Sequence, residues 1–261
     1  MEIYPVKDIE FQQAFERIYN DVTANYNANI GYNCAIFVGG QPGVGKSTFY
    51  SRNPEFKNYI AINGDAYRKY HPHYDEIVSH DIENMAQRTQ DFVNKCVETM
   101  IEKLSDKGYN IIIEGTLRNP YVPINTCKQL KEKGYTSRMY VVCCDAINSW
   151  KSTINRAKEQ QARGENVRFV PIDKYNRIVN ELPKSMELIE KACCFDELTL
   201  LDRQNNVLYN SNTSSMNEKK SAAETISYIL NVDKWNSKYQ ELADAFVDLK
   251  VVEMIQQKKH I

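Results

Sequence analysis

The sequence lacks long apolar runs, an excess of either charge and paired cysteine motifs. No apolar stretch approaches the roughly 18 residues that a membrane-spanning helix requires. Its 33 Lys and Arg residues balance 34 Asp and Glu residues, which argues against a nucleic-acid-binding protein with a basic surface. The seven cysteines are odd in number and form no C-x-x-C pair, so neither a disulfide framework nor a zinc site is indicated.

The first ten residues carry no basic segment followed by an apolar stretch, so no secretory signal is visible. We therefore expect a cytoplasmic protein with reduced cysteines and with no membrane or nucleic-acid partner. At 261 residues, with 42% hydrophobic and 26% charged residues, the composition is that of an ordinary globular protein with a sizeable core.

Short apolar runs alternate with segments of helical periodicity along most of the chain. The expected strands cover residues 33–38, 59–63, 110–114, 138–144 and 197–202, and a turn at 205–206 leads to a further apolar run at 207–209. The expected helical segments are 8–26, 75–107, a stretch ending near Gly134, 145–162 and 173–191. This alternation predicts an α/β fold with a mostly parallel five-stranded sheet covered by helices on both faces.

Residues 210–220 are polar and rich in Ser and Asn, which is typical of a linker. We therefore expect a main domain over residues 1–210. Residues 211–261 would form the linker and a helical C-terminal extension packed on or near the core.

One motif fits the pattern G-x-x-x-x-G-K-[ST] without a mismatch, directly after the first expected strand. The nucleotide-binding residues expected from it are Gly40, Gln41, Pro42, Gly43, Val44, Gly45, Lys46, Ser47 and Thr48. The glycines let successive backbone N–H groups face one anionic group, and the helix that follows adds its positive N-terminal end. Lys46 would reach the β- and γ-phosphates of ATP, and Ser47 would place its hydroxyl on Mg²⁺.

Polar residues follow three further strands, where ligands bind in open α/β sheets. Asp65 follows the second strand, where it could accept a proton from a substrate hydroxyl or could cap the next helix. Glu114 ends the third strand, where it could bind substrate hydroxyls, orient a metal-bound water or be a partly exposed strand-end residue. Asp145 follows the fourth.

A basic segment lies downstream, with Arg156 and Arg168 on either side of Gly164. Such a segment could neutralise the charge that spreads over a transferring phosphoryl group. It could equally be the solvated face of a charged helix.

Taken in order, these motifs resemble the zeta-toxin family, the toxin kinases of bacterial toxin–antitoxin pairs. The resemblance depends on five stretches between about residues 34 and 185. They are GGQPGVGKST at 39–48, INGDAYRKYHPHY at 62–74, the long helix carrying Glu98, IIIEGTLRNP at 111–120 and RAKEQQARGENVRFVP at 156–171.

The resemblance implies a P-loop kinase that uses ATP and Mg²⁺ to phosphorylate the 3′-hydroxyl of the sugar in UDP-N-acetylglucosamine, which starves cell-wall synthesis. It also implies a cognate antitoxin as partner. By the same resemblance Asp65 would be the general base, and Lys46, Arg156 and Arg168 would be catalytic. The residues that would line the sugar-nucleotide pocket are Glu98, Glu114, Thr116, Arg118 and Thr126, with Glu102, one helical turn on, as the alternative to Glu98.

Two other functions remain compatible with the residues. One is a kinase of the same fold that acts on another small hydroxyl substrate, such as an antibiotic or a different nucleotide. The other is a non-catalytic switch protein whose nucleotide state governs a partner. A kinase forms a phosphorylated product, whereas a switch protein binds nucleotide without forming one.

Overall fold

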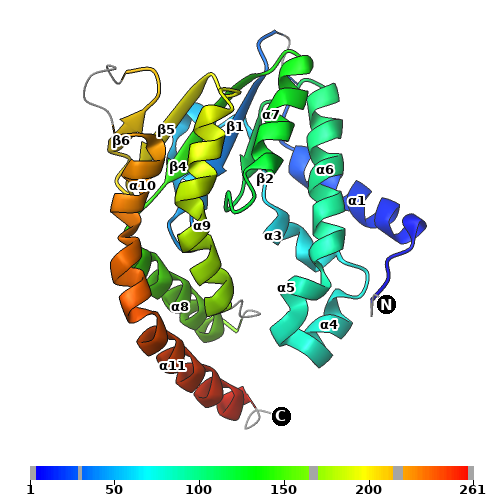
Figure 1. The fold of residues 1–261 in the computed structure, drawn as a ribbon. Coiled ribbons are helices and arrows are strands. Elements are labelled where there is room, and N and C mark those ends of the chain that lie inside the picture. The colour runs from blue at the N-terminus through cyan, green and yellow to red at the C-terminus, as the bar shows by residue number, and fades with distance from the viewer. Residues whose placement is uncertain (1–3, 29–30, 165–169, 214–219, 258–261) are drawn as a thin grey trace.

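The structure is a computed structural model that describes residues 4–28, 31–164, 170–213 and 220–257. Within these residues six strands form a single sheet in the order β2-β3-β1-β4-β5-β6 (Figure 1). The strands are β1 (Cys34–Gly39), β2 (Ile60–Ile62), β3 (Ile111–Glu114), β4 (Thr136–Val142), β5 (Glu197–Leu201) and β6 (Val207–Asn210). Strands β1 to β5 are parallel, which confirms the predicted sheet, and β6 adds an antiparallel edge strand beside β5.

Helices cover both faces of this sheet, as predicted. They are α1 (Asp8–Thr23), α2 (Lys46–Arg52), α3 (Gly64–Tyr67), α4 (Tyr74–Asp81), α5 (Met85–Arg88), α6 (Gln90–Asp106), α7 (Tyr121–Glu132), α8 (Ala146–Ala162), α9 (Ile172–Lys191), α10 (Ala222–Leu230) and α11 (Val232–Gln257). In Figure 1, α6, α7 and α9 lie in front of the sheet.

Successive residues of the central strand β1 contact different apolar layers, because side chains alternate along a strand. Ala35 and Phe37 belong to the main core, which also contains residues of α1, α6, α7, α9 and α10. Ile36 and Val38 belong to a second cluster that contains Phe49 of α2. All six residues of β1 are buried, so the loop that follows it starts from a fixed strand.

The predicted helical region over residues 75–107 is interrupted, and the helix that carries Glu98 is shorter than expected. Helices α4, α5 and α6 are separate, with a short 3₁₀ turn at Ile82–Asn84 and a non-helical residue at Thr89. The Thr89 side chain is fully buried, and its hydroxyl donates to the Met85 carbonyl. Hydrogen bonding of a Thr side chain to the backbone competes with a regular helix, which explains the interruption.

The C-terminal helices pack on the rest of the chain. Ala222, Ile226 and Leu230 of α10 are fully buried in the main core beside α9. Trp235 of α11 is also fully buried and contacts Trp150 of α8. The apolar core therefore extends well beyond residue 210.

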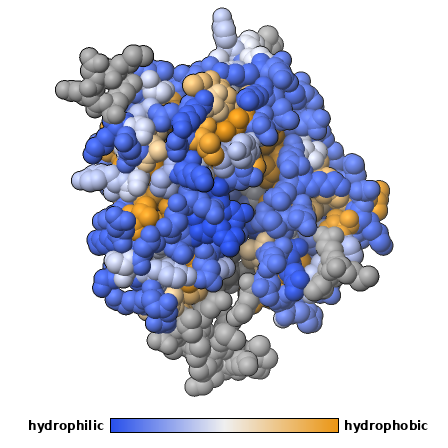
Figure 2. Space-filling model, viewed as in Figure 1, coloured by the Kyte–Doolittle hydropathy of each residue, from blue (hydrophilic) through white to orange (hydrophobic). Residues whose placement is uncertain are grey.

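The parallel strands direct their carboxyl ends to one edge of the sheet, so the segments that follow β1 to β4 lie together there. These segments begin at Gly40, Asn63, Gly115 and Cys143. No helix among the described residues is long and apolar enough to cross a membrane. The face of the molecule in Figure 2 is mostly hydrophilic, with apolar residues in small separate patches.

Candidate active site

The loop after β1 contains two glycines, Gly40 and Gly43, whose replacement would produce a clash. Gly40 and Gly43 have φ values of +135° and +77°, a region that favours glycine. A Cβ on Gly40 would lie 2.2 Å from the Val142 carbonyl oxygen, and one on Gly43 would lie 2.3 Å from that of Ser149. The loop therefore packs tightly against the end of β4 and against α8.

Lys46 begins α2 and points back into this loop. Its ammonium donates to the carbonyl oxygens of Gly40 at 3.0 Å and Gln41 at 3.2 Å. Burial holds the pKa of Lys46 below its usual value, while the negative charges of Glu114 and Asp65 act to raise that pKa. The positive charge of Arg156 acts to lower it. One ammonium thus lies within electrostatic reach of a residue from each of three other segments.

Glu114, the last residue of β3, connects the loop to the end of β2. Its Oε2 atom accepts hydrogen bonds from the Ser47 hydroxyl at 2.9 Å, the Tyr50 hydroxyl at 3.0 Å and the Asn63 amide at 3.3 Å. Burial, and next the charge of Glu114, raise the pKa of Tyr50 to about 12, so this hydroxyl remains a donor at neutral pH. The three donors satisfy a carboxylate that is only half-buried.

Asp65 does not cap the helix that follows β2. Asn63 is the capping residue, and its side-chain oxygen accepts from the backbone N–H of Asp65 at 3.1 Å. The Asp65 carboxylate instead accepts from Arg68 Nε at 3.0 Å, and the Asp65 side chain is 54% exposed. The capping alternative for Asp65 is therefore wrong, and its carboxylate lies at the surface of the site.

Two further positively charged residues, Arg118 and Lys174, lie within electrostatic reach of the region around Asp65. Partial burial holds the pKa of Lys174, on α9, below its ordinary value. The charges of Arg118 and Arg68 act in the same direction, and that of Asp65 acts in the other. Arg118 is held at its backbone, where its carbonyl accepts from the Ser185 hydroxyl of α9 at 3.2 Å. Arg118, Lys174 and Asp65 are thus neighbours although they are far apart in the sequence.

The other predicted pocket residues contact the site less directly. Glu98 is exposed on α6 and follows Val97, which packs against Gly64 beside Asp65. Thr116 is half-buried after β3, and the half-buried Thr126 donates its hydroxyl to the Val122 carbonyl. Among the residues that the structure describes, no hydrogen bond joins these three side chains to Lys46, Asp65 or Glu114.

The direction of α6 indicates which of Glu98 and Glu102 lies nearer to the candidate site. This helix ends at Asp106, just before β3 begins, so its carboxyl end lies at the amino ends of the strands. Glu102 is one turn further towards that end than Glu98. Glu98 is therefore the residue nearer to the candidate site. Arg168, in contrast, lies outside the described residues.

Sequence reasoning missed several polar residues that support the site. They are Tyr50, Asn63, Arg68, Lys174 and Arg203. Arg203 lies after β5 and donates to the Gly43 carbonyl at 2.8 Å and to the Ser152 hydroxyl at 3.0 Å. Asn63 and Arg68 fall inside a stretch already noted as a motif, whereas no local pattern marks Lys174 or Arg203.

A metal ion at this site would meet oxygen donors. The Ser47 hydroxyl and the Glu114 carboxylate are 2.9 Å apart, and both are ligands of the kind that Mg²⁺ prefers. No group of three or more His, Cys, Asp and Glu side chains in the described part of the chain could hold a metal.

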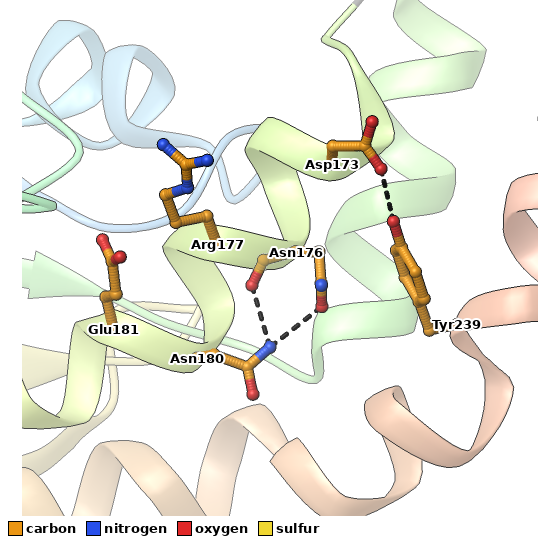
Figure 3. A pocket seen from close by; sticks show the side chains of 6 residues that line it. All are labelled: Asp173, Asn176, Arg177, Asn180, Glu181 and Tyr239. Carbon is orange, nitrogen blue, oxygen red and sulfur yellow. Dashed lines mark hydrogen bonds between the residues drawn. The ribbon is translucent and has the colours of Figure 1, made fainter.

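A separate hollow of about 420 Å³ lies between α9 and α11 (Figure 3). Its polar side chains bond mainly to each other: Tyr239 donates to Asp173 at 2.5 Å, and Asn180 donates to Asn176 at 2.9 Å. Asn176 also accepts from the indole of the buried Trp235 at 2.8 Å. The bonds from Tyr239 and Trp235 join α11 to α9. The hollow therefore belongs to the contact between these two helices and is distinct from the site around Lys46.

Comparison with known proteins gives consistent matches over most of the chain. The family model described as zeta toxin matches residues 18–214. Toxin PezT of Streptococcus pneumoniae serotype 4 is 32% identical over 245 residues, which are 93% of this chain and 94% of that protein. Toxin zeta of Enterococcus hirae is 36% identical over 190 residues, which are 71% of this chain and 66% of that protein.

A solved structure supports the same relationship. It comes from the characterisation of the PezAT chromosomal toxin–antitoxin system of Streptococcus pneumoniae. The two chains superpose with a TM-score of 0.75 and 30% identity, over 93% of this chain and 99% of the other. The structural likeness therefore covers more of the chain than the family model does.

Proposed function

Because this chain belongs to the zeta toxin family, we propose that it is a kinase that transfers the γ-phosphoryl group of ATP to the 3′-hydroxyl of the sugar in UDP-N-acetylglucosamine. Consumption of this precursor would block cell-wall synthesis. The single observation that carries the proposal is that Lys46, held in the phosphate loop by the Gly40 and Gln41 carbonyls, lies within electrostatic reach of Glu114, Asp65 and Arg156. A nucleotide-binding loop that served only as a switch would not require two carboxylates and a second cation around its lysine.

The loop at Gly40–Ser47 would bind the ATP phosphates through its backbone N–H groups. Lys46 would exchange its bonds to the Gly40 and Gln41 carbonyls for bonds to phosphate oxygens. The Ser47 hydroxyl and the Glu114 carboxylate would hold Mg²⁺, which neutralises phosphate charge when bound. Glu114 would also keep Ser47 aligned with the end of β2 through its bond to Asn63.

Asp65 would accept the proton of the attacking hydroxyl. A loose transition state for phosphoryl transfer needs little early proton removal, so orientation of the hydroxyl matters more than the strength of the base. Arg156, together with Arg168, would stabilise charge on the transferring group. Arg118 and Lys174 supply positive charge beside Asp65, where an acceptor that carries its own phosphates would lie.

We also propose that an antitoxin protein holds this chain inactive in its host. The proposal comes from the solved relative, which belongs to a toxin–antitoxin system.

The deciding experiment is incubation of the protein with ATP, Mg²⁺ and UDP-N-acetylglucosamine, followed by mass analysis of the product. We expect a mass increase of one phosphoryl group on the sugar nucleotide, and much slower formation of this product with Asp65→Ala. A panel of other small hydroxyl substrates, including antibiotics and nucleotides, tests a different acceptor. Stoichiometric ATP binding with no phosphorylated product from any acceptor would overturn the kinase proposal.

A further inference from the structure

We propose that Arg68 is a positioning residue that fixes the carboxylate of Asp65 against the junction of α5 and α6. The inference rests on the proposed role of Asp65 as the base, but it concerns a different residue and a different element. Arg68 is only 7% exposed, which is unusual for an arginine so close to the surface of a site.

Four hydrogen bonds from the guanidinium carry the inference. Arg68 Nε donates to Asp65 Oδ1 at 3.0 Å. One terminal nitrogen donates to the Ala86 carbonyl at 2.8 Å and to the Thr89 hydroxyl at 2.7 Å, and the other donates to Gln90 Oε1 at 3.0 Å. Three bonds therefore anchor the guanidinium, and one reaches the candidate base.

The anchors are themselves held in place. Thr89 is fully buried and donates its hydroxyl to the Met85 carbonyl at 2.8 Å, and Gln90 donates to Asn94 at 2.7 Å. The interruption between α5 and α6 presents the Ala86 carbonyl and the Thr89 and Gln90 side chains to a single guanidinium. The planar fork of arginine matches several acceptors at fixed angles, which lysine cannot do.

This arrangement contrasts with a second arginine–aspartate pair on the adjoining helices. Arg88 Nε donates to Asp81 at 2.8 Å, but the Arg88 side chain is 31% exposed and no further hydrogen bond from it is found in the described residues. The Arg88–Asp81 pair joins α4 to α5 without contacting a residue of the site. It is therefore a matched control of the same chemistry.

Positioning matters because a side chain that is 54% exposed, as that of Asp65 is, has rotamer freedom to lose, and the bond from Arg68 restricts it. A displacement of about 1 Å from the productive geometry can lower a rate on the order of 10²-fold. An exposed carboxylate held by a buried, anchored guanidinium loses that freedom before the substrate binds.

The test compares Arg68→Gln, Arg68→Lys and the control Arg88→Gln in the full chain. For Arg68→Gln we expect kcat to fall on the order of 10²-fold while KM for ATP changes less than about twofold. Arg68→Lys, which keeps the charge but loses the fork, should recover part of the loss, and Arg88→Gln should match the wild type. A folded Arg68→Gln with wild-type kcat would overturn the proposal.

A double substitution separates positioning from a general structural role. In an Asp65→Asn background, Arg68→Gln should lower the residual kcat no further, because the carboxylate it orients is already gone. A full additional loss would show that Arg68 acts elsewhere and would overturn the proposal. If Arg68→Gln does not fold, Arg68→Lys carries the same comparison, with a smaller loss of kcat that should also vanish in the Asp65→Asn background.

Crystal structures of the variants give a readout that needs no activity. In Arg68→Gln the Asp65 side chain should occupy several rotamers, whereas in Arg88→Gln it should keep the wild-type one. If the wild type phosphorylates no acceptor, the proposed function fails, and the order of Asp65 still decides the positioning inference. An unchanged single rotamer of Asp65 in Arg68→Gln would refute it.

Discussion

The two halves of the candidate site are built in different ways. The phosphate-loop region, residues 39–48, is continuous in sequence, and its lysine and Gln41 are buried. The acceptor region combines Asn63–Arg68 with Glu114–Arg118 and Lys174, and several of its charged groups are exposed. One half is thus fixed by local backbone geometry, and the other depends on side chains from separate elements. Substitutions should therefore act locally in the first region and cooperatively in the second.

Lys46→Ala should have the largest effect on activity. Removal of a charged donor from a preorganised phosphate site lowers kcat/KM on the order of 10³-fold. The loop carbonyls that Lys46 now satisfies can turn to water, so the fold should survive. Steady-state kinetics with a thermal melt tests this. Lys57→Ala, at an exposed lysine, is the control, and equal losses in both variants would contradict the prediction.

Asp65→Asn should have a smaller effect, on the order of 10²-fold in kcat, because the transition state requires little proton removal. The ATP KM should stay near the wild-type value, since the phosphate-loop region is intact. Asp75→Asn, at an exposed aspartate of α4, serves as control. If Asp65→Asn raised the ATP KM and spared kcat, the separation between the two regions would be wrong.

The scaffold of the acceptor region should weaken in acid. His71 is 4% exposed and packs edge-on against Phe92 of α6. Burial, and next the neighbouring His73, lower the pKa of His71 to about 4 from an ordinary value of 6.5. Between these two values the unfolded chain binds a proton that the folded chain does not, so the free energy of unfolding falls as the pH falls from 6.5 towards 4.

Protonation linked to His71 should lower the free energy of unfolding by about 2 kcal/mol at pH 5 relative to pH 8. Denaturant unfolding of the wild type and of His71→Gln at both values measures it. The variant should show a smaller difference between the two pH values. His80→Gln, at an exposed histidine, is the control. An identical pH dependence in wild type and His71→Gln would rule out this source of acid sensitivity.

The smallest expected effect is a coupling free energy between the phosphate-loop region and the acceptor region. Ser47 and Glu114 join the two halves through one 2.9 Å hydrogen bond. A double-mutant cycle with Ser47→Ala and Glu114→Gln, measured by ATP binding, should give a coupling free energy of about 1 kcal/mol. Strict additivity would mean that the two regions bind their substrates independently.

The phosphate-loop region could be predicted residue by residue from the sequence, and much of the acceptor region could not. The loop is local: its glycines, Lys46 and Ser47 lie within one motif, and the strand before it is marked by an apolar run. Arg68 anchors Asp65 through residues about 20 positions away, and Lys174 comes from a helix on the other side of the site. Such contacts depend on how the elements pack, which periodicity does not encode.

Packing between separate elements also explains why the interruption between α5 and α6 was not predicted. The interruption at Thr89 involves a buried hydroxyl, which donates to the Met85 carbonyl and accepts from the distant Arg68, rather than a glycine or proline, the usual local signals of a helix end. The five parallel strands were predictable because each is a short apolar run that ends at polar residues. The short antiparallel strand β6 was visible only as an apolar run after a turn.

The burial of α10 has a consequence for when the core can form during synthesis of the chain. Ala222, Ile226 and Leu230 belong to the main core beside α9, yet they are made after all six strands of the sheet. A nascent chain that had released only β1 to β6 from the ribosome would still expose the apolar flank of α9. The main core therefore closes only after all six strands have been made, and ribosomes that stall before α10 would yield an unfinished core.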